Sequence, residues 1–281
     1  MGFELQGHRG ARGLAPENTL PGFREAMKHG VHRLELDVGL SADGVLIVHH
    51  DTHLSPDIAR LDGAWIEQPV ALRSLRWQDL SLYDVGRMKP GTDYAARFPE
   101  ARGSDGVRIP SLAEVVALGE PLNVETKIDP TRPEATASPE AFAAALLALE
   151  VDRSTVVVQS FDWRVFPHLD GAFETACLTE ADTVLPGSAW TGGLDPADFE
   201  DLPALVQAAG CSIWSPDHEQ LDADAVARAH ELGLRVIPWT VNDPGRGGIL
   251  VQWGVDGLIT DHPERFTAFS SRGQTEATSG P

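Results

Sequence analysis

Three carboxylates in the sequence are spaced as they would be on the faces of two β-strands. Glu35 and Asp37 are separated by one leucine, and Glu125 lies two residues before Lys127. Along a strand, alternate side chains point to the same side, so each of these pairs would share a face. Neighbouring carboxylates repel each other and are costly to bury unless a positive charge lies between them. Glu35, Asp37 and Glu125 would therefore offer hard oxygen ligands that suit Mg²⁺ or Ca²⁺.

Two histidines and two basic residues could complete a reaction centre. His8 and His50 can each donate or accept a proton near neutral pH. Arg9 and Lys127 carry fixed positive charge, and an arginine can hold two oxygens of a phosphate at once. Lys127 is one of only three lysines, against nineteen arginines. Because lysine is so rare in this chain, its presence in a motif is less readily explained by chance. A metal, two cations and two imidazoles suit displacement at phosphorus, where charge on the nonbridging oxygens must be stabilised and the leaving oxygen protonated.

These groups need a scaffold, and the sequence alternates between strand-like and helix-like runs. Eight such units in about 250 residues predict a (β/α)8 TIM barrel, in the α/β class. The alternative, a doubly wound open sheet, would normally carry a Gly-rich dinucleotide turn, which Gly10, Gly13 and Gly22 do not match. The expected strands begin at Phe3, Arg33, Leu122, Thr155, Phe173, Cys211, Arg235 and Gly257. Helices are expected at 20–29, 111–118, 138–150, 163–169, 203–209, 222–232, 247–253 and 263–269.

In a TIM barrel the reacting groups lie at the carboxyl ends of the strands, and the sequence meets this requirement. The first expected strand runs into His8 and Arg9. The turn at 43–44 would fold the second strand back toward His50 and Asp51. The other expected strand ends carry Glu35 and Asp37, Glu125 and Lys127, Gln159, and Trp239 followed by Asn242.

Residues 52–108 form a long irregular segment in which prolines are scattered among short apolar patches. Because this is too long for a plain loop, we expect an insertion subdomain after the second strand, with a helix around 74–83. Residues 1–270 would then be a single catalytic domain. The small, polar tail at 271–281 is expected to be disordered.

The charge balance limits the classes of partner. The chain has 42 acidic and 22 basic residues, and its formal net charge of -20 opposes binding to nucleic acid or to anionic membranes. No apolar run approaches the ~20 residues of a membrane helix. Cys177 and Cys211 indicate no disulfide framework, and the N-terminus lacks the basic and apolar regions of a signal peptide. We therefore expect a cytoplasmic protein without stable membrane association, whose oligomeric state the sequence leaves open.

An ordered set of motifs resembles the glycerophosphodiester phosphodiesterase family. The set spans roughly residues 5–268, and its order makes it more specific than any single piece. The first half consists of His8-Arg9-Gly10, Pro16-Glu17-Asn18-Thr19, Glu35-Leu36-Asp37-Val38, and Asp43-Gly44 leading to His50-Asp51. The second half consists of 109–112, 123–127, Gln159-Ser160-Phe161, 239–242 and 254–263.

The resemblance implies a TIM barrel with an insertion after the second strand and a small-molecule substrate, a phosphodiester such as glycerophosphocholine. Hydrolysis would give glycerol 3-phosphate and an alcohol. Glu35, Asp37 and Glu125 would bind the divalent cation, Arg9 and Lys127 would hold the phosphate, and His8 and His50 would be the acid/base pair. His50 is assigned as acid to the leaving alkoxide and His8 as base, with the reverse assignment and a cyclic phosphate intermediate both left open.

Several further residues are expected to support the site. Glu17 would lie close to the metal, with Asn18, Asp51, Gln159 and Asn242 as possible supports. Asp51 and Asp261 are expected to orient neighbours through hydrogen bonds. Trp239 is either a wall of the substrate site or core packing. The alternative role for Glu125 and Lys127 is a buried ion pair that is purely structural. The run 54–57 departs from the Arg-Thr pair that many relatives carry after His-Asp.

Two other functions compete with this one. A phospholipase D-like enzyme acting on lysophospholipids or other diesters would need an apolar groove near the site and access to a membrane. A catalytically silent barrel that only binds phosphate or metal would not need two histidines, because binding alone requires no proton transfer.

Overall fold

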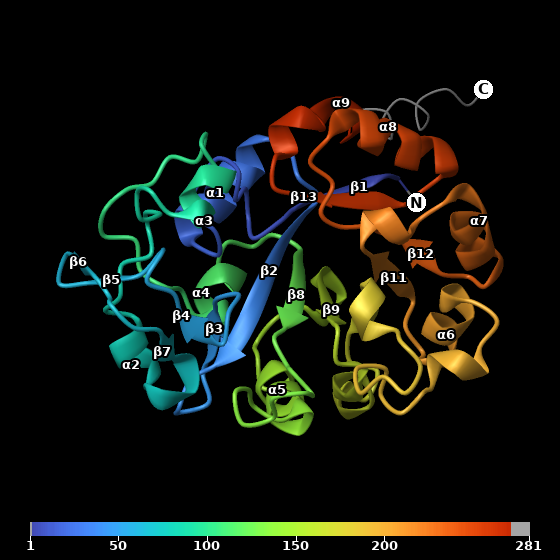
Figure 1. The fold of residues 1–281 in the computed structure, drawn as a ribbon, viewed down its shortest axis with the longest axis horizontal. Coiled ribbons are helices and arrows are strands. Elements are labelled where there is room, and N and C mark those ends of the chain that lie inside the picture. The colour runs from blue at the N-terminus through green and yellow to red at the C-terminus, as the bar shows by residue number, and fades with distance from the viewer. Residues whose placement is uncertain (1, 271–281) are drawn as a thin grey trace.

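Eight parallel strands form the centre of the protein (Figure 1). The structure, a computed structural model, describes residues 2–270. Each parallel strand coincides with one of the expected strand-like runs, which confirms the predicted barrel. The strands are β1 (Glu4–Gly7), β2 (Arg33–Leu40), β8 (Leu122–Thr126), β9 (Val156–Ser160), β10 (Glu174–Thr179), β11 (Ile213–Pro216), β12 (Arg235–Val236) and β13 (Gly257–Thr260).

The barrel is nearly closed. β1 pairs in parallel with both β2 and β13, and the sheet runs from β2 through β8, β9, β10 and β11 to β12. Single backbone hydrogen bonds bridge the remaining gap between β12 and β13, such as Asp256 N to Val236 O at 2.9 Å and Ile259 N to Pro238 O at 3.0 Å. The expectation that β12 extends to Trp239 is wrong, because Pro238 has no N–H to donate to a ladder.

Helices lie outside the ring of strands (Figure 1). Several begin at a side-chain cap: Thr19 accepts from Gly22 N, Ser138 from Ala141 N and, as expected, Asp222 from Ala225 N. The expected helices at 163–169 and 263–269 are instead a 3-10 helix, Trp163–Leu169, and a 3-10 turn, Pro263–Arg265, before α9. The barrel helices are α1 (Leu20–Lys28), α4 (Leu112–Val116), α5 (Pro139–Leu147), α6 (Leu202–Ala208), α7 (Ala223–Glu231), α8 (Pro244–Trp253) and α9 (Thr267–Ser270).

A hairpin follows β2, as the sequence predicts. β3 (Leu46–Val48) runs antiparallel to β2 and places Val38 opposite Val48. Gly44 in the intervening turn has φ 77°, a conformation that glycine adopts without strain. The backbone N–H of His49 donates to Asp37 O at 3.0 Å. The hairpin therefore returns the chain to the carboxylates of β2 just before His50.

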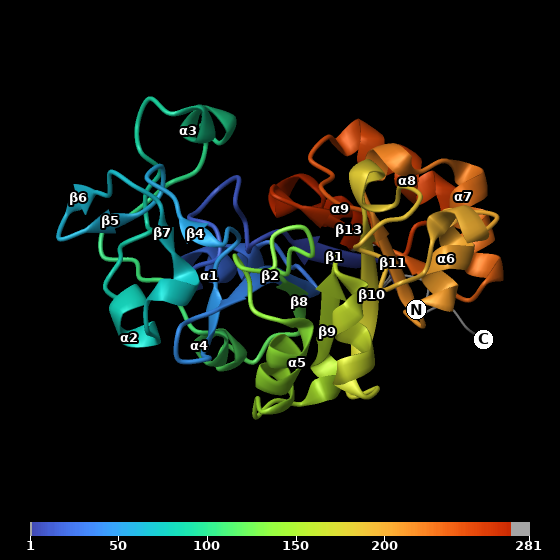
Figure 2. The ribbon, with the colours of Figure 1, turned by 60° about the horizontal axis from the view of Figure 1, so that its bottom comes forward.

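The segment 52–108 contains two small sheets, one 3-10 turn (Leu72–Ser74) and two short α-helices. β4 (His53–Leu54) pairs with β7 (Val70–Ala71), and β5 (Arg60–Leu61) pairs with β6 (Ala64–Trp65). The helix expected at 74–83 covers only α2 (Trp77–Leu80), and α3 (Asp93–Arg97) follows it. The segment has its own buried cluster, which includes Leu54, Leu72, Leu80 and Tyr83. Figures 1 and 2 place it at one side of the barrel. The division into domains stays a prediction, and the tail 271–281 lies outside the described residues.

The two cysteines correct one expectation. Cys177 in β10 and Cys211, just before β11, are joined as a disulfide, with their Cα atoms 6.1 Å apart. The sequence indicated no disulfide framework because it has only two cysteines, and the parallel pairing of β10 with β11 brings these two together across 34 positions of the chain. The cysteines therefore no longer argue for a reducing compartment, and a cytoplasmic location stays a prediction.

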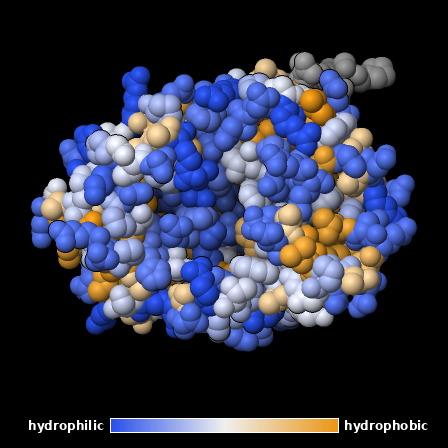
Figure 3. Space-filling model, in the orientation of Figure 1, coloured by the Kyte–Doolittle hydropathy of each residue, from blue (hydrophilic) through white to orange (hydrophobic). Residues whose placement is uncertain are grey.

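The face in Figure 3 is hollowed at its centre, and hydrophilic residues surround the hollow. Within the described part of the chain, no helix combines the length and the apolar character needed to cross a membrane.

Candidate active site

Many of the expected functional residues lie at or near the carboxyl ends of the barrel strands. His8 and Arg9 directly follow β1, and Lys127 directly follows β8. The parallel register places Asp37 of β2 opposite Glu125 of β8, and Glu125 opposite Gln159 of β9. Strand pairing alone therefore brings together Asp37 and Glu125, which are more than 80 residues apart in sequence.

Three buried carboxylates form the centre of the site. Glu35, Asp37 and Glu125 each offer an oxygen within 4.8 Å of the others. Burial and the charges of Asp37 and Glu125 raise the pKa of Glu35 well above its ordinary value. Burial, with a contribution from Asp37, raises the pKa of Glu125 to about 7 even though Lys127 opposes the shift. One oxygen of Asp37, Oδ1, is buried without a hydrogen-bond partner. An all-carboxylate set with an unpartnered oxygen and excess negative charge fits a hard divalent cation.

Two buried cations border this cluster. Arg9 contacts Glu17 Oε1 through Nη1 at 3.1 Å and Asp37 Oδ2 through Nε at 3.3 Å. Lys127 Nζ lies 2.6 Å from Glu125 Oε1 and 3.6 Å from Asp37 Oδ1. Burial alone would lower the pKa of each basic group, but the neighbouring carboxylates prevail and raise it. Both side chains therefore stay charged beside the carboxylates.

The backbone around Arg9 is held in an uncommon conformation. Arg9 has φ 51° and Asn18 has φ 53°, both in the left-handed region that non-glycine residues rarely adopt. In this conformation the Arg9 N–H donates to Glu35 Oε2 at 2.8 Å. Asn18 Nδ2 donates to Asp37 Oδ2 at 2.8 Å, and Asn18 Oδ1 accepts from the Asp37 N–H at 3.2 Å. The strained segments thus orient two of the three carboxylates.

His8 is held by a second group of charged residues. Its Nδ1 lies 2.7 Å from Asp261 Oδ1, and its Nε2 lies 4.0 Å from Glu35 Oε2. Arg12 Nε donates to the same Asp261 oxygen at 2.8 Å, and Asn242 Nδ2 donates to Asp261 Oδ2 at 2.8 Å. Despite burial, the charges of His8 and Arg12 hold the pKa of Asp261 well below its ordinary value. Nδ1 of His8 is therefore committed to Asp261, and Nε2 is directed toward the carboxylates.

His50 has a similar partner in a more open position. Its Nδ1 lies 2.7 Å from Asp51 Oδ1. Partial burial and the positive charges of Lys127 and Arg9 lower the pKa of His50 to about 4. The hydrogen bond from His50 in turn lowers the pKa of Asp51 to about 2. Each of the two expected acid/base residues is thus backed by an aspartate at Nδ1.

The remaining expected residues surround this centre. Gln159 Nε2 donates to Glu35 Oε1 at 2.8 Å, and Asn123 Nδ2 donates to Gln159 Oε1 at 2.8 Å. Glu17 also accepts a hydrogen bond from the Tyr94 hydroxyl. Arg12 and Asn123 were not among the site residues expected from the sequence. Of the two, only Asn123 could have been identified from the sequence, since it shares a strand face with Glu125.

Two cavities meet at the site. The inner cavity, of about 170 Å³, is lined by His8, Arg9, Glu35, Glu125 and Lys127 among others. The outer cavity, of about 830 Å³, shares His50, Glu125, Lys127, Phe161 and Trp239 with it and extends to Asp51, Asp129, Glu180 and Trp190. Trp239 therefore lines a cavity and is not enclosed in the core.

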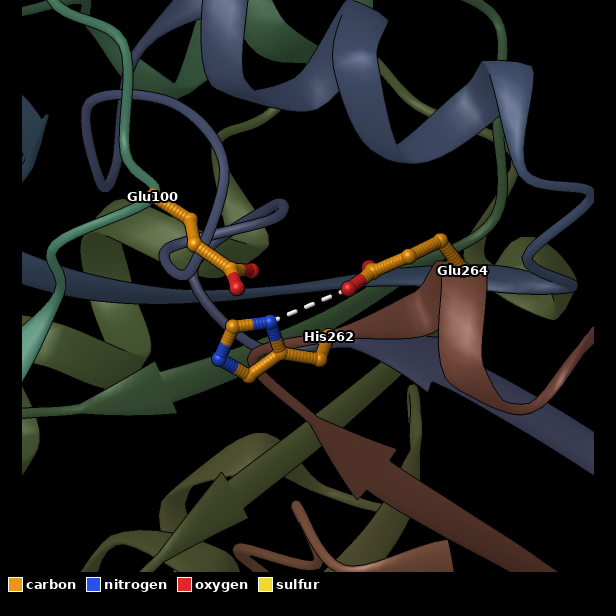
Figure 4. A group of neighbouring side chains, drawn as sticks. All are labelled: Glu100, His262 and Glu264. Atoms are coloured by element: carbon orange, nitrogen blue, oxygen red, sulfur yellow. Dashed lines mark hydrogen bonds and ion pairs between the residues drawn. The ribbon is translucent and has the colours of Figure 1, made fainter.

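A second carboxylate and histidine group lies outside these cavities. His262 Nδ1 lies 3.1 Å from Glu264 Oε1, and Glu100 approaches from the 52–108 segment (Figure 4). Arg265 Nη2 lies 3.4 Å from Glu100, and Arg265 Nε lies 3.4 Å from Glu264. Since an arginine already supplies positive charge to both glutamates, this group is a structural ion-pair cluster.

Known proteins resemble this chain in both sequence and fold. The model of the glycerophosphoryl diester phosphodiesterase family matches residues 8–265. The glycerophosphodiester phosphodiesterase of Bacillus subtilis (strain 168) is 29% identical over 269 residues, which cover 92% of this chain and 83% of that protein. A crystal structure from Silicibacter pomeroyi DSS-3, assigned to the same kind of enzyme, has a TM-score of 0.83 and 32% identity over 96% of this chain and 94% of that one.

A more distant structure shares the fold. The Oleispira antarctica phosphodiesterase, solved in complex with the product sn-glycerol-3-phosphate, has a TM-score of 0.67 and 21% identity over 95% of this chain and 96% of that one. With the family model matching nearly the whole barrel, the chain belongs to the glycerophosphoryl diester phosphodiesterase family and is an enzyme of that family.

Proposed function

We propose that this enzyme hydrolyses glycerophosphodiesters to glycerol 3-phosphate and an alcohol, with a divalent cation, Mg²⁺ or Ca²⁺, and two histidines. The observation that carries the proposal is the buried cluster of Glu35, Asp37 and Glu125, with Nε2 of His8 directed toward it. The product bound to the Oleispira antarctica phosphodiesterase supports the same product here.

The three carboxylates would hold the cation. When bound, the ion supplies positive charge to the phosphoryl oxygens as negative charge develops on them. Arg9 and Lys127 would bind the phosphate from the same side, since both border the cluster and line the inner cavity. Gln159 and Asn18 keep Glu35 and Asp37 oriented, so the ligands need not rearrange when the cation binds.

The two histidines would move the protons. Because an aspartate takes Nδ1 of each ring, Nε2 is the atom that exchanges a proton with the substrate. We assign His8 as base to the attacking oxygen, because it lines only the inner cavity. We assign His50 as acid to the leaving alkoxide, because it also lines the outer cavity through which the alcohol can depart. A bound phosphodiester brings negative charge beside His50, which favours its protonated form.

The competing functions fit the site less well. A lysophospholipid would have to be drawn from a membrane, and the formal net charge of -20 opposes approach to an anionic membrane surface. A barrel that only binds phosphate would have no use for two histidines that each keep an aspartate partner.

The test uses the purified protein with glycerophosphocholine. We expect release of glycerol 3-phosphate, loss of activity in EDTA and recovery with Mg²⁺ or Ca²⁺. Turnover that persists after complete removal of divalent cations would overturn the mechanism. Absence of turnover with any cation and any glycerophosphodiester would overturn the function.

A further inference from the structure

We propose that the outer cavity is a head-group subsite that selects diesters whose alcohol carries an ammonium or quaternary ammonium group. The inference rests on the proposed function, since it places the leaving alcohol of the same reaction in this cavity. The cavity shares His50, Glu125 and Lys127 with the reaction centre, so a group attached to the phosphate extends into it directly.

Three aromatic side chains form one wall of the subsite. Phe161 lies between Trp239 and Trp190, with ring centroids 5.5 Å and 6.3 Å away and interplanar angles of 90° and 78°. The rings therefore form a corner and not a parallel stack. Trp239 Nε1 donates to Ser215 O at 2.9 Å, which fixes the plane of its indole. All three side chains are only partly buried and line the cavity. A rigid aromatic corner of this kind attracts cations through the negative faces of the rings.

The cavity wall also carries a negative charge, which complements a cationic head group. Glu180 follows β10 and, within the part of the chain that the structure describes, forms no ion pair. Burial and the neighbouring acidic groups Asp182 and Asp217 raise its pKa and outweigh the opposing charge of Lys127. The guanidinium of Arg132, also on the wall, is already bound to Asp129 at 2.7 Å.

The outer wall thus presents aromatic rings and a carboxylate to a ligand. A cationic head group gains from both, whereas an anionic head group is repelled and a neutral polyol gains little from the rings. The whole-chain charge of -20 acts in the same direction, because a diester with a cationic head group has no net charge and is not repelled on approach.

The experiment compares two substrates of nearly equal shape. One is glycerophosphocholine, and the other is the diester of glycerol phosphate with 3,3-dimethylbutanol, which replaces the quaternary nitrogen by carbon. We expect the wild-type enzyme to favour the choline ester in kcat/KM by about tenfold or more. Glu180→Gln should reduce this preference severalfold, mainly by lowering kcat/KM for the choline ester. Trp190→Leu should reduce the preference in the same way.

Glu150→Gln is the matched control, since Glu150 is exposed and lines neither cavity. It should keep the full preference, and thermal unfolding of each variant verifies the fold. Efficient hydrolysis of both esters at equal kcat/KM would overturn the subsite while the phosphodiesterase function stands. A preference that survives both Glu180→Gln and Trp190→Leu would also overturn it. Absence of turnover on every diester would overturn the function and the subsite together.

Discussion

His8 Nδ1 lies 2.7 Å from Asp261 Oδ1, although the two residues are 253 positions apart in the chain. β1 and β13 are neighbours in the barrel, and each residue directly follows its strand. Arg12 and Asn242 donate to the same carboxylate, so Asp261 stays ionised and fixed in place. A fixed carboxylate at Nδ1 keeps a proton on that nitrogen and leaves Nε2 free to accept one.

This relationship predicts the effect of Asp261→Asn. An amide can present its NH₂ group to Nδ1, which would shift the ring proton to Nε2 and remove the base. We expect kcat to fall by about 10²- to 10⁴-fold, while cation binding measured by calorimetry stays close to that of the wild type. Asp198→Asn, at an exposed aspartate that lines neither cavity, is the control and should retain full activity. Asp261→Asn with normal kcat would show that the pair is only structural.

The roles of the two histidines can be separated by the leaving group. His8→Ala and His50→Ala should each lower kcat for glycerophosphocholine by about 10²- to 10⁴-fold. A p-nitrophenyl diester releases p-nitrophenolate, a stable anion that needs no general acid, so His50→Ala should recover most of its activity on that substrate. His8→Ala should not. The exposed His168→Ala serves as a control. If His8→Ala is the variant that recovers, the assignment of acid and base is reversed.

The sequence predicted the strands and the residues at their ends because both follow from periodicity. Alternation within a strand fixes which residues share a face, and parallel strands bring their carboxyl ends to one edge. The spacing of Glu35, Asp37 and Glu125 was therefore enough to group them. The end of β12 was predicted less accurately. The pattern of 235–239 is strand-like, and only Pro238 interrupts the ladder of backbone hydrogen bonds.

The features that were missed depend on irregular segments. Arg12 reaches Asp261 from the turn after β1, and Trp190 reaches Phe161 from the long loop after β10. No periodicity describes where such segments go, and their positions follow from contacts across the barrel. The Cys177–Cys211 disulfide was missed for a different reason, since it depends on the register of β10 against β11, which the pattern of strands does not give.

Stability in the absence of metal should depend on Glu125. Burial raises the pKa of this carboxyl from 4.5 to about 7, so between these pH values the folded protein holds a proton that the unfolded chain has released. The contribution of Glu125 to the free energy of unfolding therefore falls as pH rises from about 4.5 to about 7. His50 acts in the opposite direction, because its pKa is lowered to about 4.

Comparison of two variants isolates the contribution of Glu125. In EDTA, Glu125→Gln should gain stability relative to the wild type between pH 5 and pH 8, by on the order of 1–3 kcal/mol. With Ca²⁺ or Mg²⁺ the order should reverse at pH 8, since only the wild type keeps all three carboxylates. Denaturant unfolding at several pH values measures this, with Glu150→Gln as the matched control. Parallel pH profiles for Glu125→Gln and the wild type in EDTA would refute the proposed rise in the pKa of Glu125 on folding.

Asn18 combines a strained backbone with two hydrogen bonds to Asp37, and two substitutions separate these contributions. Asn18→Gly and Asn18→Ala both remove the hydrogen bonds, so both should weaken cation binding and lower kcat/KM to a similar degree. Alanine must also hold φ 53°, which glycine adopts freely, so Asn18→Ala should be less stable than Asn18→Gly by about 1–2 kcal/mol.

Asp62 provides the matched control, because it has φ 50° in an exposed turn between β5 and β6. Asp62→Ala should be less stable than Asp62→Gly by a similar amount, and both should keep normal cation binding and activity. Denaturant unfolding, calorimetric titration with Ca²⁺ and steady-state kinetics give the three readouts. If Asn18→Gly binds the cation as tightly as the wild type, the Asn18 side chain has no part in orienting Asp37.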